Sequence, residues 1–278
     1  QGVRRYIELV KKFPKSEFVA DAYNALGEHY FNANNVRNAR RAWTKALQTK
    51  KERVITYATY KLAWCDLNEG QYADAVERFQ RVIRRAGESG KKTGKNDAME
   101  LSDEAAADIV RAFAHLDEVD GVYKYLKEVR NEQWAKKSMA TLGAIYTSQG
   151  KYDLSVRTYR FMLRKYPHHL DAPMYQSNIV KSFAKLNKRD KVRREANRLV
   201  DMYKPSSLWS KKVSRMGTEA ATDALDRAYE YTEGYMRQLV TDFHSEAQKT
   251  KRAGTYRLAR DIYKKYLDNF SEQAVCEK

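Results

Sequence analysis

Proline and glycine are scarce in this sequence, with 4 and 12 residues respectively among 278. So few turn-forming residues exclude an all-β or loop-rich protein. Two cysteines are too few for a disulfide framework, and we expect a buried thiol at Cys65 and a tail thiol at Cys276. No apolar run approaches the roughly 20 residues that a membrane-spanning helix requires, and no secretory signal peptide is recognisable.

Motifs that carry catalytic or metal chemistry are missing as well. The five histidines are scattered, and the one adjacent pair, His168 and His169, points its side chains apart. The Gly- and Lys-rich stretch around Lys92 lacks the Gly-Lys-Ser/Thr ending and the preceding strand of a phosphate-binding loop. No nucleophile elbow or zinc-protease motif occurs. We therefore predict no enzyme, no metal, no cofactor and no small-molecule substrate.

Positive charge, in contrast, is abundant. Lys and Arg number 53 against 36 Asp and Glu, a net charge of +17 that attracts nucleic acid, anionic lipid, wall polymers or acidic proteins. Nucleic-acid readers interleave basic residues with base-stacking aromatic residues, and the densest basic run has none, so nucleic acid is not expected. This run is predicted to be either a solvated helix face or a docking patch for an acidic partner. Its residues are Lys188, Arg189, Lys191, Arg193, Arg194 and Arg198.

The sequence repeats itself with a period of about 34 residues. The clearest unit begins at Lys136, and its small residues Gly143 and Ser155 are spaced so that two helices can approach closely. Tyr146 and Tyr159 are spaced to fill the gaps beside them. Further units begin at Ala20, Thr56, Asp103 and Pro173, and a partial unit spans Gly254 to Tyr266. The pattern predicts an all-α fold, a right-handed tetratricopeptide-repeat (TPR) solenoid of antiparallel helix pairs.

Departures from the period define three predicted regions. Residues 1–19 correspond to the second helix of a truncated N-terminal repeat, and residues 20–217 to an array of about five units. Residues 87–102 form an insertion in this array, predicted to be a mobile basic loop that is either solvated or anion-binding. Residues 218–278 are expected to hold one long helix, from Thr218 to Lys251, and a final TPR-like helix. The long helix is predicted to lie along the fifth unit and close its groove, the alternative being a projecting helix that docks a partner.

The first helices of TPR pairs line a groove, and position within each unit predicts which residues point into it. Tyr60 and Trp64 are the predicted anchors, the alternative being that they pack against a neighbouring helix. The cationic clamp of chaperone-binding TPRs is not reproduced, because Asn24 fits it but Glu28 would repel a peptide carboxylate. The full predicted groove set is Asn24, Glu28, Phe31, Tyr57, Tyr60, Lys61, Trp64, Arg111, His115, Asn178, Lys181 and Lys185.

Three segments resemble a particular TPR group: FPKSEFVADAYNALGEHYF, YKLAWCDLNEGQYADAVERFQRVI and LVTDFHSEAQKTKRAGTYRLARDIYKKYLDNF. They are similar to periplasmic or outer-membrane TPR proteins, often lipoproteins, of predatory and gliding delta-proteobacteria, one type of which belongs to the gliding-motility envelope complex. The similarity covers most of the chain, including the insertion and the long helix. It implies an envelope scaffold, attached to the outer membrane only through an N-terminal anchor that this sequence lacks.

The leading functional hypothesis is therefore a non-enzymatic protein-interaction scaffold in the periplasm, associated with the outer membrane. It would hold together components of a motility or outer-membrane complex, and its partners would be acidic or wall-associated proteins. The alternative is a cytoplasmic TPR adaptor or secretion chaperone.

Overall fold

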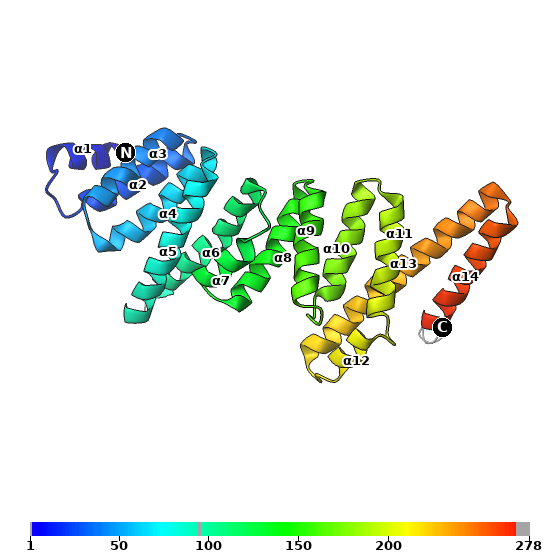
Figure 1. Ribbon diagram of the computed structural model, residues 1–278. Coiled ribbons are helices and arrows are strands. Elements are labelled where there is room, and N and C mark those ends of the chain that lie inside the picture. Colours follow the sequence, from blue (N-terminus) through cyan, green and yellow to red (C-terminus); the bar gives the residue numbers. More distant parts are fainter. Residues whose placement is uncertain (1, 94–95, 271–278) are drawn as a thin grey trace. The chain divides into compact units, whose positions relative to one another are not determined.

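The computed structural model describes residues 2–93 and 96–270, and every regular element within them is an α-helix (Figure 1). The predicted all-α class is thus confirmed. The chain divides into two compact units, residues 1–142 and 143–278. The division falls inside α8 (Glu132–Ser148), where the repeat period continues without a break, and the sequence did not indicate it.

Unit 1 is built from helices that pack in the order of the sequence. α2 packs on α3, α3 on α4 and α4 on α5, with α1 against α2, so successive helix pairs are stacked. The helices are α1 (Gly2–Lys12), α2 (Val19–Asn32), α3 (Val36–Gln48), α4 (Glu52–Asn68), α5 (Tyr72–Thr93), α6 (Asn96–Leu116), α7 (Val122–Val129) and the first part of α8.

The insertion at residues 87–102 is helical, and the prediction of a loop is wrong. α5 continues to Thr93, α6 begins at Asn96, and the two helices pack against each other, while residues 94–95 lie outside the described part. Lys and Glu recur in this stretch and are good helix formers, and each glycine costs a helix only about 1 kcal/mol. The insertion therefore lengthens two adjacent helices.

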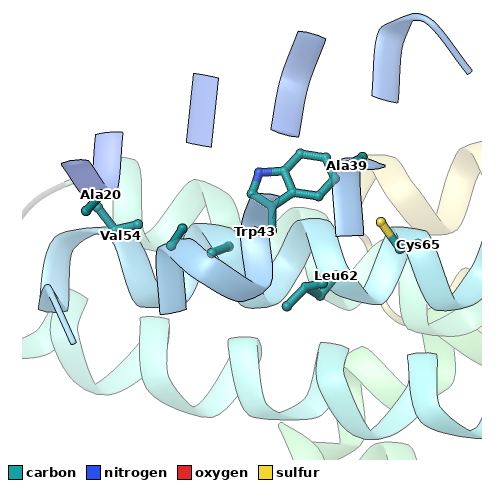
Figure 2. Close-up of a cluster of buried hydrophobic side chains, with 8 residues drawn as sticks. Ala20, Ala39, Trp43, Val54, Leu62 and Cys65 are labelled. Atoms are coloured by element: carbon teal, nitrogen blue, oxygen red, sulfur yellow. The ribbon is translucent and has the colours of Figure 1, made fainter. Parts of the chain in front are cut away.

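Trp43 lies at the centre of the core of unit 1 (Figure 2). Its ring is fully buried among residues of α2, α3 and α4, including Ala20, Leu62 and Cys65. A Cβ atom on Gly27 would overlap this ring, so the indole packs directly on glycine backbone. Burial raises the pKa of Cys65 to about 12, which keeps the predicted buried thiol protonated. Cys276 lies outside the described residues.

Unit 2 contains the strongest repeat of the sequence, and its predicted crossing is present. A Cβ atom on Gly143 would lie 2.8 Å from the Tyr159 ring, and the Ser155 hydroxyl is 2.7 Å from the hydroxyl of Thr147. The remaining helices are α9 (Tyr152–Lys165), α10 (Ala172–Lys185), α11 (Arg189–Tyr203), α12 (Leu208–Ser214), α13 (Glu219–Thr250) and α14 (Ala253–Phe270).

The turns inside four helix pairs share one backbone feature, a residue with left-handed φ. These residues are Asn34 (56°), Gly70 (77°), Gly150 (74°) and Asn187 (54°). Glycine and asparagine adopt this conformation at the least cost, which is why the turn is recognisable in the sequence.

The long helix expected from Thr218 to Lys251 is present as α13. The Thr218 side chain accepts a hydrogen bond from the backbone N–H of Ala221, and Lys251 ends the helix with a φ of 51°. Its first half packs through alanines on Trp209 and Tyr203, and its second half packs on α11 and α14. α13 thus lies along the fifth pair, α10 and α11, as predicted, and does not project alone.

We predict that Gly143→Ala lowers the free energy of unfolding by about 1–3 kcal/mol, because the new methyl group overlaps the Tyr159 ring. Gly234→Ala, within α13, is the matched control. Apart from the backbone of α13 itself, no atom of the described residues lies within 4 Å of the added Cβ there, so alanine should stabilise this helix by about 0.5–1 kcal/mol. Urea unfolding followed by circular dichroism measures both, and equal effects of the two substitutions would contradict the assigned crossing.

Candidate partner-binding surfaces

Four of the predicted groove residues of α2 and α4 form one cluster on unit 1. Glu28 accepts a hydrogen bond from the Tyr57 hydroxyl at 2.8 Å and another from the Lys61 ammonium at 3.2 Å. Lys61 also lies 5.4 Å from the ring centroid of Tyr57 and 5.9 Å from that of Phe31. We call these four residues the Glu28 cluster. The anionic charge of Glu28 is thereby tied to residues of the chain itself.

A second cluster joins α4 to α6 around Asp108, a residue that is only 4% exposed. Its carboxylate accepts hydrogen bonds from the Tyr60 hydroxyl at 2.8 Å, the Trp64 indole N–H at 3.1 Å and the Arg111 guanidinium at 2.8 Å. We call these four residues the Asp108 cluster. Sequence reasoning found its three donors but missed the acceptor, although Asp108 precedes Arg111 by one helical turn on the same face.

Tyr60 is not an exposed anchor, and that prediction is wrong. It is 8% exposed, packs edge-on against Phe79 and donates its hydroxyl to Asp108. Trp64 contacts the same Phe79 ring but remains partly exposed. Buried tyrosine and tryptophan side chains usually donate a hydrogen bond to a polar partner. Here the buried carboxylate of Asp108 on α6 accepts both hydrogen bonds.

Tyr57 and Tyr60 are fixed hydrogen-bond donors. Burial raises the pKa of each phenol above its ordinary value, and the neighbouring carboxylates of Glu28 and Asp108 raise it further. Both hydroxyls therefore keep their protons throughout the physiological range.

The remaining predicted groove residues of unit 1 differ in their exposure to solvent. The side chain of Arg111 is 57% exposed despite its contact with Asp108, and the exposed His115 stacks on Tyr72 with ring centroids 4.5 Å apart. The side-chain oxygen of Asn24 is buried and has no hydrogen-bond partner among the described residues. Arg111 and His115 are therefore the most accessible members of this face.

The predicted groove residues of unit 2 lie on α10, where α13 covers part of the face. Tyr235 of α13 donates its hydroxyl to the backbone carbonyl of Ser177 at 3.4 Å, and Lys181 lies 5.9 Å from the ring centroid of Tyr231. The side-chain amide of Asn178 points to the sulfur of Met174. Lys185 is exposed.

The six residues of the basic run do not form a single patch, because they are distributed around three turns of α11 and its preceding turn. Lys188 pairs with Asp153 at 3.4 Å, and Lys191 lies 5.2 Å from the Phe183 ring centroid. Arg198 lines a cavity of about 190 Å³ that faces α9. Arg189 and Arg193 line a different cavity that faces α13.

This second cavity, the α11/α13 cleft, has a volume of about 850 Å³. It lies between the start of α11, with the turn before it, and the second half of α13, which runs obliquely past α11 before α14 turns back (Figure 1). The cleft was not predicted from the sequence, because the angle between two packed helices leaves no recognisable pattern in either segment. Its lining residues are Ala184, Asn187, Arg189, Asp190, Val192, Arg193, Leu239, Asp242, Phe243, Ser245, Glu246 and Lys249.

Within residues 2–93 and 96–270, no group of three or more His, Cys, Asp or Glu side chains is placed to hold a metal ion. In the same ranges, no helix has both the length and the apolar character of a membrane span.

Comparison with known proteins identifies the repeat. Residues 57–89, which are most of α4 and α5, match the family model described as tetratricopeptide repeat. The fold is a TPR fold of antiparallel helix pairs. A solved structure, the TPR2AB-domain:pHSP90-complex of yeast Sti1, is similar over 90% of this chain and 98% of that chain, with 15% sequence identity and a TM-score of 0.33. No curated protein sequence matches.

We predict that Asp108→Ala destabilises unit 1 by about 2 kcal/mol, because the buried Tyr60 hydroxyl and the Trp64 indole N–H lose their acceptor. Asp103→Ala on the same helix is the control, since the Asp103 side chain is 62% exposed and its surface pair with Arg130 contributes less than about 1 kcal/mol. Thermal and urea unfolding compare the two, and similar losses would show that the Asp108 cluster does not stabilise the fold.

Proposed function

We propose that this chain is a non-enzymatic protein-interaction scaffold, and that the face formed by α2, α4 and α6 binds a partner segment. The observation that carries the proposal is the convergence of side chains from three successive first helices into the Glu28 and Asp108 clusters. Hydrogen bonds inside each cluster hold its side chains in place before a partner arrives. Such pre-organisation reduces the conformational entropy lost on binding.

An extended segment with an acidic residue suits this face. The guanidinium of Arg111 has five N–H donors, and one of its nitrogens contacts Asp108, so others remain for a partner carboxylate or backbone carbonyl. The side chain of Lys61 is 19% exposed and its ammonium is paired with Glu28, so Arg111 is the main cation that a partner can reach on this face. Trp64 and Phe31 add partly exposed aromatic surface beside these charges.

Site-specific photo-crosslinking tests this role. We expect a benzophenone side chain in place of Glu104 to capture a discrete partner in an extract of the source organism. Glu104 is exposed and lies one helical turn before Asp108. Its carboxylate is close enough to raise the pKa of both Tyr57 and Tyr60, but Glu104 is not a member of either cluster. The same group at Lys124 of α7, where the side chain is 83% exposed, is the control.

The adduct at position 104 should weaken strongly in the Arg111→Ala variant, because the most exposed cation of the face is lost. An adduct pattern identical at positions 104 and 124, or one that Arg111→Ala leaves unchanged, would contradict a specific partner at this face.

We further propose that the scaffold works in a bacterial cell envelope, where it holds together components of a motility or outer-membrane complex. The resemblance of three long segments to envelope TPR proteins supports this location, and the net charge of +17 suits acidic or wall-associated partners. A cytoplasmic adaptor or secretion chaperone is the competing role.

Fractionation of cells that express the full-length gene product separates these two roles. We expect the protein in the membrane and periplasmic fractions, and labelling with radioactive palmitate detects a lipid anchor directly. Recovery with a cytoplasmic marker enzyme would overturn the envelope proposal and favour the adaptor. It would leave the binding role of the α2, α4 and α6 face intact.

A further inference from the structure

The α11/α13 cleft of unit 2 has an apolar floor between charged walls. Val192 of α11 and Leu239 and Phe243 of α13 supply the floor, and both α13 residues are partly exposed. Leu239 also packs at the margin of the Met236 and Phe270 cluster, so the floor continues into the core of the unit. An apolar surface of this kind, supported from behind, is suited to receive side chains from a partner.

The two walls of the cleft carry net charges of opposite sign. On the α11 side Arg189 and Arg193 outnumber Asp190, whereas on the α13 side Asp242 and Glu246, one turn apart, outnumber Lys249. In the part of the chain that the structure describes, no ion pair joins the two walls across the gap. The nearest contacts are local: Arg193 reaches Asp190 of its own helix at 3.7 Å, and Asp242 accepts a hydrogen bond from Gln238 of its own helix at 2.9 Å.

The remaining charges of these walls are available to a partner. Among the described residues, neither Arg189 nor Glu246 makes an ion pair, and Lys249 adds an unpaired cation at the far end of the α13 wall. A uniformly acidic ligand would be attracted by Arg189 and Arg193 but repelled by Asp242 and Glu246. A uniformly basic ligand would meet the opposite conflict, so the cleft selects a ligand with both signs in fixed places.

We infer that the α11/α13 cleft binds an amphipathic α-helix of a protein partner, with an apolar stripe on the floor, acidic residues along one flank and basic residues along the other. A helix fits because its apolar stripe and its two flanks lie side by side at fixed angles, and because helices pack naturally into the groove between two others. The inference rests on the proposed protein-binding role but concerns a surface separate from the α2, α4 and α6 face.

Binding of synthetic helices to the intact chain tests the inference. The probe is a side-chain-stapled peptide of about 18 residues, roughly 27 Å long, with a Leu stripe, Glu on one flank and Lys on the other. The comparison peptides keep the stripe and carry Glu on both flanks, Lys on both flanks, or the same Glu and Lys mixed on each flank. Exchanging the two flanks is not a control, because a helix can lie in the cleft in either direction. We expect the polarised peptide to bind at least about tenfold more tightly than the other three, since misplaced flank charges lose several favourable pairs.

Charge-reversed variants locate the binding. Replacing Arg189→Glu and Arg193→Glu together should weaken the polarised peptide by about tenfold or more, because both walls are then acidic. Adding Asp242→Lys and Glu246→Lys should restore the affinity, since opposite walls return with their signs exchanged. Arg194→Glu is the matched control on the same helix, outside the cleft lining, and should change the affinity by less than about threefold.

Four outcomes would overturn the inference. Equal affinity for the polarised peptide and the Glu-only peptide would indicate general attraction of anions to a basic protein. An equal loss in the Arg194→Glu variant, or no recovery in the fourfold variant, would place any binding outside the cleft. Failure of all four peptides to bind would reject a helical occupant. Because the crosslinking at position 104 uses another surface, it can succeed or fail independently of each result.

Discussion

The structure depends on the close approach of paired helices at points where an aromatic ring packs against glycine backbone. The Trp43 ring occupies the space that a side chain at Gly27 would need, and Tyr159 does the same at Gly143. Packed protein interiors tolerate neither voids nor overlaps of even a methyl group, so such a crossing fixes the spacing of two helices closely. Fixed helices in turn hold their outward side chains in constant positions, on which both proposed binding surfaces depend.

Buried carboxylates provide the second constraint, since they link helices beyond the pairs. Asp66 of α4 pairs with Arg40 of α3 at 2.7 Å, Asp108 joins α6 to α4, and Glu195 of α11 pairs with Arg160 of α9. All three acids are at most 5% exposed, and a buried charge is tolerated only when partners of this kind surround it. Part of the large positive charge is therefore structural. The rest, including Arg189 and the exposed Arg111, lies on surfaces where partners can reach it.

In unit 2 the continuous helix α13 packs against the core with its first half and lines the α11/α13 cleft with its second half. Ala221, Ala224 and Ala228 allow its first half to pack closely on the α11 and α12 side chains. Its second half continues past that contact and is supported by α14 through Met236 and Phe270. A helix bends sharply only at a proline or a comparable break. The direction in which the first half of α13 packs on α11 and α12 therefore determines how wide the cleft beside its second half is.

The all-α repeat, the close crossing of Gly143 and Tyr159 and the extent of α13 can all be predicted from the sequence alone. These features follow from local chemistry and from a regular period, and both can be recognised without tertiary contacts. The burial of Tyr60 against Asp108, the dispersal of the basic run and the α11/α13 cleft, in contrast, follow from tertiary packing. Each depends on which residue of another helix lies opposite, and the crossing angle that sets this is a property of whole packed helices, not of any one segment.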